Sequence, residues 1–245
     1  MGKIWKKFKY RFTAKKLTSH DQKMAGFYGQ FVGAGDLCFD VGANIGNRAK
    51  IFLALGADVV AVEPQKRCVE FLQAGFGCNP KLHIENLALG DKPGETEMML
   101  SEEDTLSSLS NEWIESVRAS GRFSQYSWNL RQKVEVSTLD LLIEKYGVPV
   151  FIKIDVEGFE ENVVAGLSQQ VKVISFEFVP EFIDATWKVL ELLTQLGSYK
   201  VNFSKGESMD FELDKWVSKE ELVNILKNMP HDLNLFGDVY VKFDD

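Results

Sequence analysis

The sequence contains little cysteine and histidine and no long apolar run. Its 245 residues include three cysteines, Cys38, Cys68 and Cys78, which form no CxxC pair and cannot all be bridged. We therefore expect free thiols and a cytoplasmic location, because disulfides persist in oxidising compartments. The three histidines stand at no metal-ligand spacing, so no zinc site is predicted. No run of about 18 apolar residues is present, and no transmembrane helix is expected.

Positive charge is scarce outside the first residues of the chain. The formal net charge is −8, but residues 1–23 carry eight Lys or Arg and one Asp, which leaves −15 for residues 24–245. An acidic body argues against nucleic acid as a partner, since nucleic-acid binding depends on Lys and Arg that replace counterions. The composition is otherwise ordinary, with 45% apolar and 26% charged residues, so a folded domain with a substantial core is expected.

Residues 1–16 combine this positive charge with a stripe of apolar side chains. Ile4, Trp5, Phe8 and Phe12 recur at helical spacing among lysines, which predicts a short basic amphipathic helix. Such a helix either packs its aromatic side chains on the main domain or contacts a membrane surface or a partner protein. The sequence leaves both interpretations open.

Two glycines follow the first apolar strand and mark a candidate ligand site. A predicted strand over 37–41 runs into a turn with Gly42 and Gly46, and a helix pattern follows. Glycine lets the backbone turn tightly, so a ligand can lie against the turn and the first N–H groups of the helix. A second apolar strand over 58–62 ends in Glu63, whose carboxylate can accept hydrogen bonds from both hydroxyls of a ribose. This pattern describes half of a nucleoside-binding α/β fold.

Strands and helices alternate along the rest of the chain. Continuous apolar runs favour a largely parallel sheet that helices cover on both faces. Residues 1–34 are predicted to form a helical, basic extension, and residues 35–245 the main domain. Further strands are predicted over 82–89, 150–154, 171–178, 199–203 and 238–243, with helices over 21–31, 47–55, 66–74, 139–146, 159–167, 181–196 and 219–228.

Residues 101–131 interrupt this alternation. They are rich in serine and polar, with isolated aromatic side chains. A connection of this length favours a lid-like insertion on the substrate side, and partial disorder is the alternative. Short strands over 96–100 and 132–137 flank it and are predicted to pair as a hairpin.

Three carboxylates stand at or near the ends of predicted strands. Asp155 and Glu157 follow the strand over 150–154, and Glu177 comes late in the strand over 171–178. Because parallel strands deliver ligand-binding groups at their carboxyl ends, all three are predicted to line one crevice as catalytic groups. A carboxylate buried beside others has a raised pKa and is a better base. The site is predicted to hold no metal. The alternatives are a structural role for Asp155 and a divalent cation bound through Asp155.

Two further charged residues near these strands have local interpretations. Glu160 begins a predicted helix, where an acid interacts favourably with the helix dipole, so a local role is favoured. Lys153 alternates with Ile152 and Ile154 within a strand. A charge there needs a partner or a function, so both a buried ion pair and substrate binding are open.

These motifs resemble a known family. DVGANIG at 40–46, VEP at 62–64 and LALGD at 87–91 look like the S-adenosylmethionine site of class I methyltransferases. TLD at 138–140 and IKIDVEGFE at 152–160 resemble the FkbM-type methyltransferases specifically. The resemblance implies a Rossmann-like α/β fold with a seven-stranded, mostly parallel sheet and an antiparallel last strand. It also implies S-adenosyl-L-methionine as cofactor and methyl donor, and O-methylation of a small-molecule or glycan acceptor.

The same resemblance implies roles for individual residues. The turn of Gly42, Ala43, Asn44 and Gly46 would cradle the methionine portion of the cofactor, and Glu63 would hold the ribose hydroxyls. The backbone around Leu87 and Ala88 would border the adenine. Asp40 would contact the amino group of the cofactor through a water or a loop N–H.

Two other classes of function compete with this one. An NAD-dependent oxidoreductase is disfavoured, because Asn44 breaks the G-x-G-x-x-G spacing. A non-enzymatic protein that docks to a membrane or partner through residues 1–16 is disfavoured by the intact glycine turn and Glu63. The residues that shape an acceptor pocket are expected within 101–131 and 205–235.

Overall fold

A seven-stranded sheet forms the centre of the computed structural model, which describes residues 10, 14, 16–229, 232 and 235–244. Its strand order is β3-β2-β1-β7-β8-β10-β9. The last strand of the chain, β10, runs antiparallel to both of its neighbours, and the other paired strands are parallel, as predicted. The strands are β1 Leu37–Val41, β2 Asp58–Val62, β3 Leu82–Glu85, β7 Phe151–Ile154, β8 Val173–Phe178, β9 Tyr199–Lys205 and β10 Gly237–Phe243.

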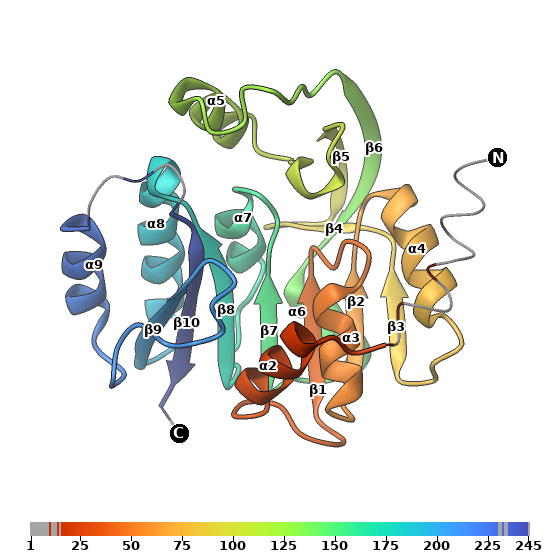
Figure 1. Ribbon diagram of the computed structural model, residues 1–245, viewed down its shortest axis with the longest axis horizontal. Helices are drawn as coiled ribbons and strands as arrows, with labels where there is room; N and C mark the ends of the chain where they lie inside the picture. The colour runs from red at the N-terminus through yellow and green to blue at the C-terminus, as the bar shows by residue number, and fades with distance from the viewer. Residues whose placement is uncertain (1–9, 11–13, 15, 230–231, 233–234, 245) are drawn as a thin grey trace.

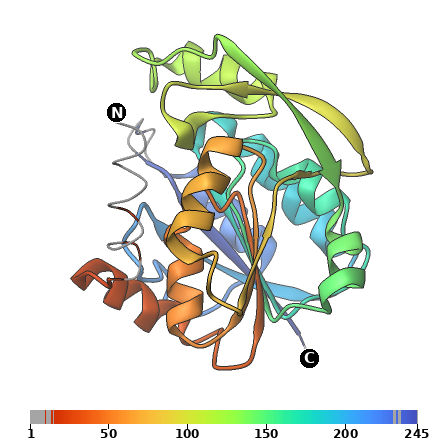
Figure 2. The same cartoon turned by 90° about the vertical axis from the view of Figure 1, so that its right-hand side faces the viewer.

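Helices cover both faces of this sheet, which confirms the predicted layering (Figure 2). Apolar side chains of α2, α3 and α4 join one buried cluster with the sheet, and those of α6 to α9 join another. Side chains of the sheet strands contribute to both clusters, so both faces of the sheet are buried, as expected for parallel strands. The helices are α2 Ser19–Tyr28, α3 Asn47–Ala54, α4 Lys66–Phe76, α6 Leu139–Tyr146, α7 Glu160–Ala165, α8 Ile183–Thr194 and α9 Lys219–Lys227, with the short η2 Pro180–Phe182 before α8.

Polar side chains fix where several of these helices begin. Thr138 caps α6, where its Oγ1 accepts the N–H of Leu141 at 3.2 Å. Thr18 and Asp21 form a reciprocal capping box at the start of α2. Each cap satisfies N–H groups that the first helical turn leaves without partners. These local signals explain why α6 has the predicted bounds.

The strand predicted over 82–89 is wrong in one respect, because it divides in two. β3 ends at Glu85, and β4 (Ala88–Leu89) joins a separate sheet. Between them the Asn86 amide donates to the carbonyls of Glu63 and Pro64 at 2.9 and 3.1 Å. These bonds turn the chain across the end of β2, so an apolar run that looks continuous in the sequence serves two sheets.

The second sheet carries the predicted insertion. β5 (Gly94–Leu100) and β6 (Leu130–Ser137) pair antiparallel, which confirms the hairpin, and β4 completes the order β4-β6-β5. Residues between β5 and β6 form η1 (Asp104–Leu106) and α5 (Asn111–Ser120). Figure 1 shows α5 and this hairpin above the carboxyl ends of the central strands.

The insertion is folded around its own aromatic side chains, so the alternative of partial disorder is wrong for these residues. Trp113 and Trp128 are 1% and 3% exposed and pack with Leu106 and Val117 in a separate cluster. The Trp128 indole N–H donates to the Leu106 carbonyl at 2.6 Å. Buried tryptophans of this kind determine the conformation of a segment whose polar composition alone does not predict it.

The predicted amphipathic helix over 1–16 lies largely outside the described residues. Tyr10 is described, and its ring packs edge-on against Phe71 and Phe76 of α4. Its hydroxyl donates to the Ile45 carbonyl within the glycine turn at 2.5 Å. Among the helices that the structure describes, none has the length and apolar character needed to cross a membrane.

Candidate active site

A cavity of about 230 Å³, open to solvent, lies at the carboxyl ends of β1, β2 and β7 and beneath the insertion. Most residues predicted for the site line it, and three do not. Asp40, Ala43 and Gly46 lie behind its wall. The predicted residues on the wall are Gly42, Asn44, Glu63, Leu87, Ala88, Asp155, Glu157 and Glu177.

Gly42 sits where β1 and β7 finish side by side. Its φ is +82°, and a Cβ on it would lie 1.7 Å from the carbonyl oxygen of Asp155, so only glycine fits. Gly46 has φ +95° and begins α3, where a Cβ would lie 2.7 Å from a methyl group of Leu72. Asn44 also adopts a left-handed conformation, at φ +48°. The turn therefore holds an exposed backbone edge at the cavity.

Asp40 lies within β1 and is 1% exposed. Burial raises its pKa to about 6, and one carboxylate oxygen, Oδ2, has no partner among the described residues. A hydrogen bond from the Ala49 N–H in the first turn of α3 favours the charged form. Ala43 is buried at 4%, and its N–H donates to the Val62 carbonyl at 3.0 Å. Both residues support the turn from behind.

Glu63 ends β2 with its side chain almost wholly buried, at 2% exposure. Its carboxylate accepts the N–H groups of Asn44 at 2.8 Å and Gln65 at 2.7 Å. Burial raises its pKa to about 7, and these two hydrogen bonds oppose that shift. Each oxygen keeps acceptor capacity beyond one bond, so the carboxylate can also accept hydroxyl groups from the cavity.

Asp155, Glu157 and Glu177 meet at one place on the wall, as predicted. One carboxylate oxygen from each lies within 4.8 Å of the others. Burial and the neighbouring carboxylates raise the pKa values of Glu157 and Glu177 well above the ordinary 4.5. This spacing also suits a divalent cation. The expectation of a metal-free site remains a prediction.

A second cavity of about 800 Å³, also open to solvent, adjoins the first and shares Thr105, Glu157 and Glu177 with it. Its other walls are largely apolar and come from the insertion and from the chain around Val179 and Phe236. The shared carboxylates of Glu157 and Glu177 therefore stand between the two cavities.

The family model of the methyltransferase FkbM domain matches residues 40–215. The chain belongs to this family. S-adenosylmethionine is the cofactor of this methyltransferase, which removes the NAD-dependent alternative. No curated protein sequence matches the chain.

Several solved structures are similar to this methyltransferase at low sequence identity. A putative O-methyltransferase from Klebsiella pneumoniae is 7% identical, with a TM-score of 0.48. The match covers 100% of this chain and 91% of the Klebsiella chain. The O-methyltransferase from Bacillus cereus in complex with SAH is 8% identical with a TM-score of 0.47 and the same coverage. A putative rRNA-methylase from Clostridium thermocellum is 10% identical with a TM-score of 0.47, covering 94% and 99%. These distant likenesses add nothing to the family assignment.

The first cavity fits the cofactor of the methyltransferase in the chemistry of its walls. Glu63 offers a buried acceptor for the ribose hydroxyls, and apolar Leu87 and Leu89 border space for a purine. The turn at Gly42 and Asn44 presents backbone rather than side chain to the methionine portion. When bound, S-adenosylmethionine supplies an electrophilic methyl group on a positively charged sulfur. The methyltransferase must then align an acceptor atom with that methyl at about 3 Å.

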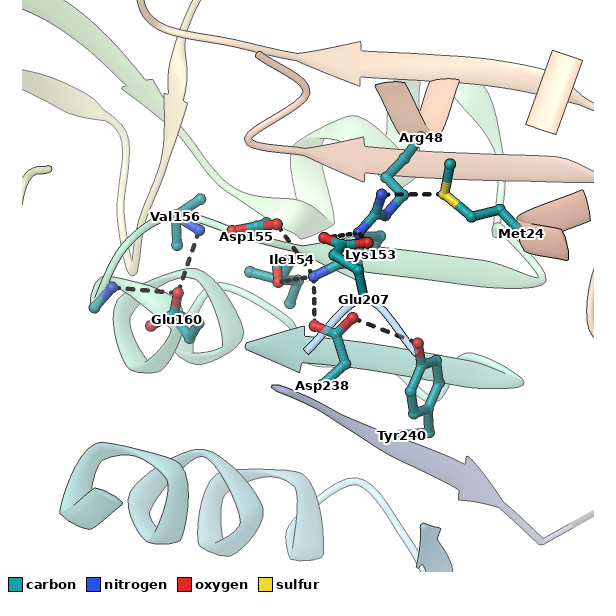
Figure 3. A network of polar contacts seen from close by, with 11 residues as sticks. Met24, Arg48, Lys153, Ile154, Asp155, Val156, Glu160, Glu207, Asp238 and Tyr240 are labelled. Carbon is teal, nitrogen blue, oxygen red and sulfur yellow. Dashed lines mark hydrogen bonds and ion pairs between the residues drawn. The ribbon is translucent and has the colours of Figure 1, made fainter. Parts of the chain in front are cut away.

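Lys153 of the methyltransferase is a buried member of an ion-pair network (Figure 3). Its Nζ lies 2.8 Å from Asp238 and 3.4 Å from Asp155. The ammonium is fully buried, so it offers no surface to a substrate, and the ion-pair interpretation is confirmed. Glu160 likewise has a local role, because it accepts the N–H groups of Val156 at 3.2 Å and Gly158 at 3.3 Å.

Sequence reasoning missed several residues on the cavity walls. Asp104 and Thr105 come from the insertion, whose fold the sequence did not specify. Glu207 follows β9 and also lines the first cavity. Because β9 is parallel to β8, its carboxyl end lies at the same edge as the others. Parallel strands deliver ligand-binding groups at their carboxyl ends, and Glu207 follows the predicted strand over 199–203. The sequence therefore contained a signal that could have placed Glu207 in the site.

Proposed function

We propose that the protein transfers the methyl group of S-adenosylmethionine to a hydroxyl oxygen of a small molecule or glycan. The observation that carries this proposal is the position of Glu157 and Glu177, which line both cavities. In this account the cofactor occupies the first cavity and the acceptor the second, so the acceptor oxygen meets the methyl group beside these carboxylates.

An alcohol is a weak nucleophile until its proton leaves, so O-methylation needs a nearby base. As the new C–O bond forms, the C–S bond breaks, its electron pair stays on sulfur, and the hydroxyl proton passes to a carboxylate. We assign this role to Glu177, whose carboxylate makes no hydrogen bond or ion pair with another described residue. Burial and the neighbouring carboxylates raise its pKa well above the ordinary 4.5, which makes the deprotonated carboxylate a stronger base.

Methyl transfer from labelled S-adenosylmethionine to a panel of matched hydroxyl, amine and thiol compounds tests the proposal. We expect methyl ethers as products. The rate at saturating substrate should rise with pH through the raised pKa of Glu177, because the base acts only when deprotonated. Products methylated only on nitrogen, carbon or sulfur would contradict the proposal.

A further inference from the structure

The charged residues on the wall of the cofactor cavity all have one sign. Of the described residues that line it, none is Lys, Arg or His. S-adenosylmethionine carries two cationic groups, the sulfonium and the ammonium of its methionine portion, and one carboxylate. An acidic wall therefore complements this ligand. The acidic lining residues are Glu63, Asp104, Asp155, Glu157, Glu177 and Glu207.

Three of these carboxylates pair with cations that do not line the cavity, and one of them is Asp104, which pairs with Arg67 at 3.1 Å. Asp155 is paired with Lys153, and both oxygens of Glu207 accept from Arg48 Nη2 at 2.7 Å. Figure 3 shows Glu207 beside Arg48, with Asp155 and Lys153 close by. The three cations hold these carboxylates in place and leave negative charge on the wall.

Glu207 comes from a turn that the rest of the protein anchors on both sides. The Gly206 N–H donates to the Phe236 carbonyl at 2.6 Å. Met209 is buried at 3%, and Asp210 pairs with Lys23 of α2 at 2.5 Å. His20, also on α2, lies 3.9 Å from Glu207. The carboxylate thus reaches the cavity from a fixed backbone, although its side chain is 48% exposed.

We propose that Glu207 binds the ammonium group of the methionine portion of S-adenosylmethionine. The resemblance implies only an indirect contact of Asp40 with this group, through a water or a loop N–H, and Asp40 does not line the cavity. Glu207 lines the same cavity as Gly42 and Asn44, the turn that fits the methionine portion. A carboxylate that accepts from an ammonium forms a charge-assisted hydrogen bond, which is about twice as strong as a neutral one.

Calorimetric titration with three ligands tests this assignment without any acceptor. S-adenosylmethionine has both cations, S-adenosylhomocysteine has only the ammonium, and methylthioadenosine has neither. We expect Glu207→Gln to weaken binding of the first two by at least tenfold and to leave methylthioadenosine within twofold. Glu207→Asp keeps the charge with a shorter reach, so it should give an intermediate loss.

Glu212→Gln is the matched control, because Glu212 pairs with Lys205 at 2.8 Å in the same part of the chain and does not line the cavity. It should leave all three affinities within twofold. Unchanged binding of S-adenosylhomocysteine to Glu207→Gln would overturn the assignment, and so would loss of S-adenosylmethionine alone, which would place Glu207 at the sulfonium. An equal loss for methylthioadenosine would also overturn it, since the variant would then have damaged the cavity as a whole.

Discussion

Glu177→Gln is expected to lower the rate of methyl transfer at saturating substrate by about 10² to 10⁴-fold, the usual contribution of a positioned general base. Glutamine keeps the shape of the side chain but cannot accept the hydroxyl proton. Glu177 lies in β8 between Phe176 and Phe178, and both of these neighbours are buried. Removing a partly buried charge at this position should not lower the free energy of unfolding. The measurement is single-turnover methyl transfer over a range of pH.

Glu160→Gln gives the control for this experiment. It also removes a buried carboxylate, but one that accepts backbone N–H groups and lines neither of the two adjoining cavities. We expect it to lower the midpoint of thermal unfolding and to keep a rate that rises with pH. The midpoint of that rise should move to lower pH, because the Glu160 charge contributes to the raised pKa of Glu177. A Glu177→Gln rate within threefold of the wild-type rate would contradict the assigned base. Loss of transfer with EDTA would instead indicate that Asp155, Glu157 and Glu177 bind a divalent cation.

Gly42→Ala is expected to lower the free energy of unfolding by about 3 kcal/mol or more, through left-handed strain and a backbone collision. The new Cβ would lie 1.7 Å from the Asp155 carbonyl oxygen, and neither β1 nor β7 can move away without breaking the paired sheet. Any folded fraction should bind S-adenosylhomocysteine poorly, because the turn and Asp155 line the same cavity. Urea denaturation and calorimetry measure the two effects.

Gly94→Ala is the matched control for this substitution. Gly94 begins β5, and no atom lies within 4 Å of the position its Cβ would take. We expect its free energy of unfolding to stay within about 0.5 kcal/mol of the wild-type value. If Gly42→Ala matched this control, the close approach of β1 and β7 at Asp155 would be wrong.

The sequence was sufficient for the parallel sheet because each element carries its own local signal. Short, mostly apolar segments predicted β1, β2 and β8, and Thr138 fixed the start of α6. The division of the strand over 82–89 was missed, because it depends on the Asn86 amide reaching the end of β2. That contact lies outside the strand and produces no periodic pattern of apolar residues in the sequence.

The site could be predicted where it follows a strand end and could not where it comes from tertiary packing. Glu63 and Asp155 are placed by the carboxyl ends of β2 and β7. Asp40 lies within β1 and does not line the cavity, so its indirect contact with the amino group remains a prediction. The fold within the predicted insertion could not be read from the sequence for another reason, since it depends on Trp113 packing directly over Gly158.

The most direct test of the cofactor site is calorimetric titration of the protein with S-adenosylhomocysteine, alongside the Glu63→Ala variant and with NAD as control ligand. Glu63 is the buried acceptor at the end of β2, so its loss should remove the hydrogen bonds to the ribose hydroxyls. We expect micromolar binding that the variant weakens by tenfold or more, about 1.4 kcal/mol in binding free energy. Equal affinity of the variant, or preferential binding of NAD, would contradict the site described.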